Sequence, residues 1–399
     1  MVAVKYIDDS FLRNLVELYE RDPGVVFAKF GGREETLLHR AALHRRIEMV
    51  EFLLEHEARQ VEDASGNTPL HCAALGGDAD VARALIEAGA ELEAANLELD
   101  RPLHLAASVG NMEVLQVILD HGGDLYSRGC QDNTALHLAA QSAQVEVMEE
   151  LVSRGLKIDN VNKAGEHPIH LAAGVAGPDK SIRHVEFLLE AGANIKKSRT
   201  KEGCTAAHYA ARSGCADTLE LLLDAECPVT KAKMQEDCRW SPVNMGDTLL
   251  ESVAKSCCSQ KGSLVLRRIM AARYKERRNR NRTESVMGRK EADRYHYEEL
   301  TTHELELSHI YTELETSIDN PQSALRMFLQ NCPEAFKCLL DNCLVASDER
   351  FTDNIGKVVF DFFLFFPEHD DNELAIVDLV IAAGKKKLVE HPLFETFIR

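Results

Sequence analysis

The sequence is poor in aromatic residues. They make up 6% of its 399 positions, with a single tryptophan, whereas 45% of the residues are hydrophobic. This balance suits helices packed through Leu, Val and Ala better than a β-sandwich or barrel. We therefore predict an ordered all-α protein.

Basic charge is also scarce. The chain has 46 Lys and Arg residues against 65 Asp and Glu residues, which gives a formal net charge of −19. Contacts to phosphate need a basic surface, and a chain this acidic would repel a polyanion overall. We therefore expect no nucleic-acid partner.

Long apolar runs are missing as well. The two longest are residues 358–366, interrupted by Asp361, and residues 374–383, interrupted by Asp378. Neither approaches the roughly 20 apolar residues that a membrane-spanning helix needs. We expect no membrane span within these residues.

The cysteines and the first residues indicate the compartment. The 11 cysteines are odd in number and scattered, and the sequence starts without the charged and then apolar pattern of a signal peptide. This predicts a reducing, cytosolic environment.

The dominant positive feature is a repeat. Six segments of the type Thr-Pro-Leu-His-x-Ala-Ala recur, and the steps between their histidines are 32, 33, 33, 33 and 38 residues. The histidines are His39, His71, His104, His137, His170 and His208. The threonines and prolines of the motif are Thr36, Thr68, Pro69, Pro102, Thr134, Pro168 and Thr205.

The second unit shows why these residues predict a helix. Thr68 can cap a helix that starts at Pro69, which has a preset φ and no amide hydrogen to waste. Ala73 and Ala74 keep one face of that helix thin, so that the helix of the next unit can approach closely.

The same unit predicts a second helix behind the first. Gly76 and Gly77 break the chain, Val81 and Leu85 have the i, i+4 spacing of a buried stripe, and Gly89 suits a left-handed cap. Each unit is therefore a helix-turn-helix that must stack on its neighbours to bury its apolar face.

The repeated histidines are predicted to be structural. Each lies one unit from the next, and packed helices are about 8–10 Å apart, so one zinc ion could not join them. We expect the imidazoles to bond to neighbouring backbone and to hold successive units together, with no metal or cofactor bound.

With this motif and period, the chain resembles the ankyrin repeat family. The resemblance implies an ankyrin-repeat solenoid of six clear repeats over residues 32–230, preceded by a helical amino-terminal cap at 1–31. It also implies protein partners bound through the concave face. The 38-residue step reflects extra residues, mostly between 174 and 184, which form either a surface insertion or a partner contact.

After residue 230 the period fades. Residues 231–290 are predicted to hold a degenerate repeat and a basic linker, and 291–319 an acidic helical linker. The basic run 267–282 is open to four interpretations: a solvated helix, pairing with the acidic segment, nuclear import, or contact with anionic lipid.

Residues 320–399 carry a second resemblance. Pro333, Glu334, Lys337, Leu339, Leu340, Asp341 and Cys343, and then Leu388, His391, Pro392, Leu393 and Phe397, resemble the segments between the ankyrin stack and the first membrane helix of TRPA-type channels, the ankyrin branch of the transient receptor potential family. This implies an apolar helical pre-membrane region of a homotetrameric, non-selective cation channel. The pore would lie beyond this chain.

That resemblance also suggests two kinds of site. TRPA-type channels sense electrophiles through cysteines, one of them directly after the Pro-Glu pair, where this chain has Ala335. Candidate redox-sensing residues are therefore Cys332, Cys338 and Cys343, with buried, inert thiols as the alternative. Lys385, Lys386 and Lys387 either contact acidic lipid or end a helix favourably for its dipole.

The sequence contains no catalytic motif such as G-x-S-x-G or H-E-x-x-H, so we expect a protein that is not an enzyme. Two functions remain. One is the cytosolic sensing and assembly domain of a TRPA-like channel, on the cytoplasmic side of a membrane. The other is an ankyrin scaffold, soluble in the cytoplasm if the chain is complete.

Overall fold

The structure is a computed structural model. It describes residues 16–175 except 18, residues 182–229 except 197, 199 and 202, and residues 249–255, 262–269, 271–272, 324–342, 344–346 and 358–360. The chain divides into two compact units, residues 1–172 with 183–193, and residues 173–182 with 194–399.

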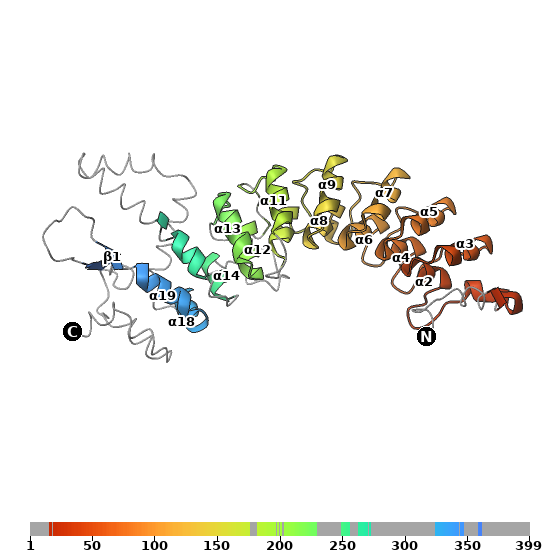
Figure 1. Cartoon of the computed structure of the whole chain (residues 1–399), viewed down its shortest axis with the longest axis horizontal. Coiled ribbons are helices and arrows are strands. Elements are labelled where there is room, and N and C mark those ends of the chain that lie inside the picture. The colour runs from red at the N-terminus through yellow and green to blue at the C-terminus, as the bar shows by residue number, and fades with distance from the viewer. Residues whose placement is uncertain are drawn as a thin grey trace. The chain divides into compact units, whose positions relative to one another are not determined.

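The first unit consists of helix pairs that follow one another along the chain (Figure 1). Each pair has an inner helix and then an outer helix, and α2 packs on α4, α4 on α6, and α6 on α8. The inner helices are α2 (Leu37–Leu43), α4 (Pro69–Gly76), α6 (Pro102–Val109), α8 (Ala135–Gln141) and α10 (Pro168–Ala173). The outer helices are α3 (Ile47–Glu55), α5 (Ala79–Glu87), α7 (Met112–Asp120), α9 (Val145–Ser153) and α11 (Arg183–Glu190).

The second repeat folds as its sequence predicts. α4 begins at Pro69, directly after Thr68, and Ala73 and Ala74 are fully buried. Gly77 ends the helix with a left-handed φ of 83°. A Cβ at Gly77 would meet the side-chain amide of Asn111 in the next repeat, so both the φ angle and the close stacking favour glycine there.

The outer helices end in the same left-handed turn. Gly89, Gly122 and Gly155 have φ values of 86°, 92° and 98° after α5, α7 and α9. Glu57 and Glu226 occupy the equivalent position in the first and sixth repeats, with φ values of 59° and 58°. The turn therefore forms without glycine, at the conformational cost that a side chain adds.

Part of the predicted amino-terminal cap lies within the described residues. A short helical segment around Val16 to Arg21 precedes the 3-10 helix η2 (Pro23–Phe27). The Tyr19 ring packs edge-on against Phe52 and His56 of the first repeat, with centroids 5.9 and 4.4 Å apart. The cap is thus joined to the stack by aromatic contacts.

The second unit begins with the sixth repeat, which comprises α12 (Ala206–Ser213) and α13 (Ala216–Asp224). α14 (Leu249–Lys255) packs on α12 and is followed by a helix over residues 262–269. α18 (Ala324–Asn331) packs on α14, and α19 (Pro333–Asn342) packs on α18. The inner-and-outer arrangement therefore continues after the clear repeats.

These later helices are closely packed. A Cβ at Gly262 would lie 2.8 Å from the Ala335 Cβ and 2.9 Å from the Phe328 ring. Nδ2 of Asn331 donates to the Ala254 carbonyl at 3.2 Å. The helices of α14, 262–269, α18 and α19 thus share one core.

A small two-stranded element was not expected from the sequence. β1 (Leu344–Ala346) pairs antiparallel with β2 (Val358–Phe360), and Leu344 lies opposite Phe360. Apart from this pair, the described residues form an all-α repeat solenoid. Within the described residues, no helix is both long and apolar enough to cross a membrane.

Candidate functional site

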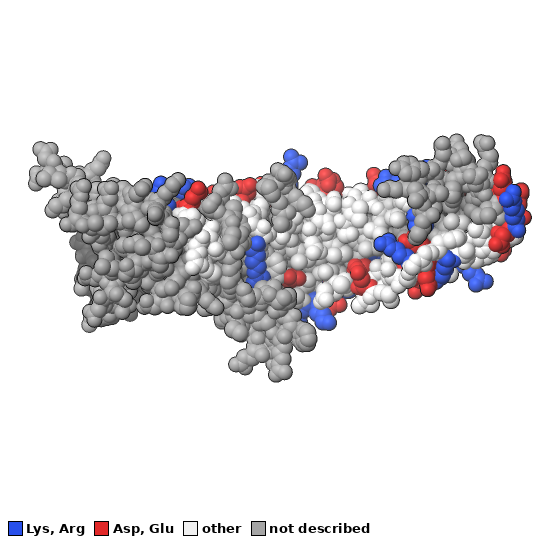
Figure 2. Space-filling model, turned by 90° about the horizontal axis from the view of Figure 1, so that it is seen from below, with Lys and Arg blue, Asp and Glu red and all other residues white. Residues whose placement is uncertain are grey.

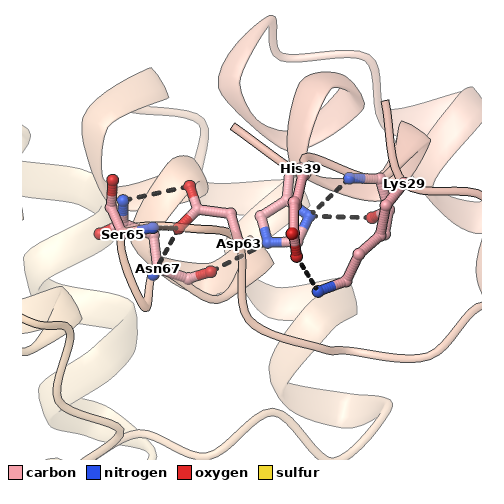
Figure 3. Close-up of polar contacts among 7 residues, drawn as sticks. Lys29, His39, Asp63, Ser65 and Asn67 are labelled. Carbon is pink, nitrogen blue, oxygen red and sulfur yellow. Dashed lines mark hydrogen bonds and ion pairs between the residues drawn. The ribbon is translucent and has the colours of Figure 1, made fainter. Parts of the chain in front are cut away.

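Each inner helix is preceded by a tight loop, which we call a finger. The second to fifth fingers are residues 63–67, 96–100, 129–133 and 162–166. In the second finger, Oδ1 of Asp63 accepts hydrogen bonds from the amides of Ser65 and Asn67, both at 2.8 Å (Figure 3). Asn96 and Asn162 hold the third and fifth fingers in the same way.

The motif histidines join each inner helix to the next finger. His39 Nδ1 accepts from the Thr36 amide at 3.2 Å, which leaves Nε2 to carry the ring proton. Nε2 then donates to the Asn67 carbonyl at 2.9 Å (Figure 3). His71 reaches the Asp100 carbonyl at 3.0 Å, and His137 reaches the Glu166 carbonyl at 3.1 Å. These bonds join the first repeat to the second, the second to the third, and the fourth to the fifth.

Burial keeps these rings neutral. Desolvation lowers the pKa of His39, His71 and His104, and it lowers the pKa of His137 to about 4. Nδ1 accepts a hydrogen bond from the amide of the residue that precedes the helix. A second proton on the ring would therefore set two N–H groups against each other. The interfaces therefore depend on a neutral imidazole with its proton on Nε2.

The interface between the third and fourth repeats departs from this scheme, and we call it the seam. The motif threonine is replaced by Arg101, and Gly129 has no side chain to hold the fourth finger. His104 Nε2 is buried facing the carbonyls of Ser127 and Asn133 without a hydrogen bond of ordinary geometry. The Asp100 carboxylate helps to hold the fourth finger instead, because its Oδ1 accepts a hydrogen bond from the Cys130 amide at 2.9 Å.

The fingers are also tied to one another through backbone bonds, except at the seam. The Ala64 amide donates to the Arg33 carbonyl, Leu97 to Ser65, and Lys163 to Gln131, at 2.8, 3.0 and 2.8 Å. Among the described residues, no such bond joins the third finger to the fourth. At the seam, side-chain bonds replace the backbone bond: the Cys130 amide donates to Asp100, and the Arg101 guanidinium donates to the Arg128 carbonyl.

The inner helices of the middle repeats carry no Asp, Glu, Lys or Arg. This is true of α4, α6, α8 and α10, whereas α2 has Arg40 and α12 has Arg212. Figure 2 shows the result as a broad uncharged expanse over the middle repeats, with charged side chains along its edges. We define the inner surface by the side chains of α4, α6 and α8 that are at least partly exposed: Leu75, Leu105, Ser108, Val109, Leu138 and Gln141.

The comparisons agree with this geometry. A family model described as ankyrin repeats in three copies matches residues 1–96, 95–162 and 155–233. The chain belongs to the ankyrin repeat family. No curated protein matches the sequence. Among solved structures, the human ASB11 ankyrin repeat domain matches 58% of this chain and 98% of its own length, with 23% identity and a TM-score of 0.47.

The ankyrin motif residues predicted from sequence occupy equivalent places. The threonines precede their helices and the prolines begin them. Thr68 and His71 form a capping box, and the Thr68 hydroxyl also bonds the His71 ring at 2.9 Å. The caps of α2, α4, α8 and α12 are therefore threonine–histidine units, whereas Arg101 and His167 precede α6 and α10.

The predicted sites of the second half are only partly within the described residues. Cys332 is buried at the start of α19, and Ala335 is fully buried one turn later. Cys338 lies in α19, but the structure does not describe its side chain. Cys343 and the cluster of Lys385, Lys386 and Lys387 lie outside the described residues.

The start of the basic run has a partner that the sequence did not suggest. Arg268 pairs with Asp224 of α13, and its guanidinium lies 4.0 Å from Glu220. These carboxylates belong to the sixth repeat rather than to the acidic segment 291–319. Residues 273–282, the rest of the run, and 176–181, most of the fifth-repeat insertion, lie outside the described residues.

Proposed function

We propose that this chain binds other proteins through the inner surface of its middle repeats. Ankyrin repeats are interaction modules, and stacking leaves a continuous binding face. The observation that carries the proposal is the uncharged inner surface, because apolar side chains such as Leu75 and Val109 remain 38% and 45% exposed there. Contiguous exposed apolar area of this kind marks an interaction site.

The test compares two charge-matched variants of the full chain as affinity baits. The first places arginine on the inner surface, as Leu75→Arg, Val109→Arg and Gln141→Arg. All three positions are exposed, so the variant should remain folded. An arginine there would be desolvated in any complex, which costs binding energy.

The second variant is the control, with Ala88→Arg, His121→Arg and Ser153→Arg at the exposed ends of α5, α7 and α9. We expect proteins bound by the natural chain to be lost from the first variant and retained by the control. Retention of the same partners by both variants would contradict the proposal.

A finer proposal concerns the protein in which this domain works. The resemblance of the Pro333 to Cys343 segment and of the Leu388 to Phe397 strip to TRPA-type channels supports a role as their cytosolic sensing and assembly domain. In that role the chain would form a homotetramer on the cytoplasmic side of a membrane, and the lysine cluster at 385–387 would face acidic lipid. Stimulus or partner binding would be coupled to a pore outside the chain.

Two measurements separate this role from that of a soluble cytoplasmic scaffold. The channel role requires the natural reading frame to continue past residue 399 into an apolar stretch of about 20 residues. It also requires the full-length product to have the native mass of a tetramer. A stop codon at position 400, or a monomeric full-length product, would favour the scaffold.

We further infer that the binding domain is longer than six repeats. α14 with residues 262–269, and α18 with α19, pack as two further inner-and-outer pairs. This supports the predicted degenerate repeat in 231–290 and adds a pair within 320–399. Truncation after residue 230 would then expose the apolar side of α12, so we expect it to lower the yield of soluble protein. A truncated chain as soluble as the full one would argue against the extension.

A further inference from the structure

The tip of the third finger exposes two leucines. Leu97 is 75% exposed and Leu99 is 63% exposed, more than the other exposed large aliphatic side chains among the described residues. Both flank Glu98 on the same short loop, beside the inner surface. An apolar pair held this far into solvent costs free energy unless a partner covers it.

The backbone at Leu99 adds to that cost. Its φ is 67°, in the left-handed region that a branched side chain rarely adopts. The equivalent positions of the second and fifth fingers are Gly66 and Gly165, with φ values of 75° and 78°. A leucine at a position suited to glycine, with its side chain in solvent, has no evident role in folding. Strain of this kind is typical of functional sites.

The seam lies next to this tip. The third finger is tied to the second by a backbone bond, from the Leu97 amide to the Ser65 carbonyl, but to the fourth by a side-chain bond, from the Cys130 amide to the Asp100 carboxylate. The fourth fingertip is also unusual, since Gln131 and Asp132 have left-handed φ values of 56° and 60°. The seam therefore joins two fingertips of unusual backbone conformation without a backbone hydrogen bond between them among the described residues.

Acidic side chains surround the leucines. Glu62, Glu98 and Asp132 are exposed on the second, third and fourth loops. None of the three forms an ion pair with a basic side chain in the described part of the chain, although ion pairs occur elsewhere in the stack. The fingertips thus present apolar contacts flanked by acidic side chains, with Arg128 as a basic neighbour whose Nη1 donates to the Asp132 main-chain carbonyl at 2.9 Å.

We propose that the third fingertip selects the partner, which is a basic amphipathic helix. Its apolar side covers Leu97 and Leu99 and continues onto the inner surface. Its Lys or Arg side chains face Glu62, Glu98 and Asp132, which favours association with this charge pattern over others. The proposal rests on the inner surface being the binding face and adds the chemistry of the ligand.

The test uses the full chain and two labelled peptides of about five helical turns. One has leucine on one face and lysine on the other, and the second has glutamate in place of lysine. The informative variant is Leu99→Gly, which removes the anchor and relieves the backbone strain together. The second is Leu97→Ala, and the control is Val161→Ala, which trims a 46% exposed side chain away from the third fingertip.

We expect the lysine peptide to bind and the glutamate peptide to bind far more weakly. Leu99→Gly and Leu97→Ala should each weaken the lysine peptide about tenfold, the effect of uncovering one leucine. Leu99→Gly should do so without lowering the urea midpoint, which a structural role could not explain. The control should bind normally.

Equal binding of both peptides, or unchanged binding by Leu99→Gly and Leu97→Ala, would overturn the proposal. The arginine variant of the inner surface separates this failure from failure of the proposed function. If only the arginine variant fails to bind the lysine peptide, the inner surface is the binding face, but the third fingertip does not select the partner. If neither kind of variant loses it, both proposals fail.

Discussion

The stack should lose stability in mild acid because its interface histidines must stay neutral. Burial lowers the pKa of His137 to about 4, against 6.5 for an unperturbed histidine. Between these values the unfolded chain binds a proton that the folded chain does not, so stability falls as the pH falls from 6.5 towards 4. Above pH 6.5 this contribution is fully present.

The size of the effect follows from the shift. At pH 5, an unfolded pKa of 6.5 and a folded pKa of about 4 correspond to a loss of about 2 kcal/mol relative to pH 7.5. With about 2 kcal/mol per molar of urea, this moves the unfolding midpoint by about 1 M. His39, His71 and His104 act in the same direction, because burial lowers the pKa of each.

The assay is urea unfolding followed by circular dichroism at pH 7.5 and pH 5, for the natural chain and for His137→Gln. The substitution lowers stability at both values, so the informative quantity is the difference between them. We expect that difference to shrink by about 2 kcal/mol in His137→Gln. His121→Gln is the matched control, since it removes an exposed histidine at the end of α7 and no bond between repeats. An unchanged pH difference in His137→Gln would refute the reasoning.

Three further outcomes test the packing. Gly77→Ala should destabilise more than Gly89→Ala, because both glycines have left-handed φ but only at Gly77 would a Cβ meet Asn111; equal unfolding midpoints would contradict close stacking. Asp100→Ala should cost about 1 kcal/mol, because it removes the acceptor of the half-buried Cys130 amide; a midpoint unchanged within error would mean that Asp100 does not hold the seam. Burial raises the pKa of the Cys72 thiol to about 12, so mass spectrometry should find it alkylated far more slowly in the folded chain than in urea, and equal rates would argue against a buried α4.

The repeat itself could be read from the sequence because each unit is a local structure. Thr68, Pro69 and Gly77 act within or next to one helix, and their pattern returns every 33 residues. The histidine role was also predictable in kind, since a buried imidazole needs a backbone partner. Which carbonyl it reaches depends on the next finger and became clear only from the structure.

The seam could not be predicted from the sequence because it arises from two substitutions, one in each of two neighbouring repeats. Arg101 and Gly129 each look like ordinary variation in the motif. Only the stacked structure shows that they disturb the same interface, where Asp100 supplies the missing acceptor. Leu99 had a readable signal, since it stands where other fingers have glycine, but its exposure depends on the fold.

The later helices were hard to predict for a different reason. α18 follows residues 262–269 only after a long charged stretch, so the 33-residue period cannot reveal that α18 packs on α14. The strands β1 and β2 are three residues each, which is too short for a pattern to show.

The central claim is that the inner surface holds the partner, and site-specific cross-linking tests it most directly. A photoreactive residue is placed at Val109 on the inner surface or at His121 on an outer helix, both exposed and both in the third repeat. With a partner identified by the affinity comparison, we predict a covalent adduct from position 109 and none from position 121. An adduct from position 121 alone would contradict the account.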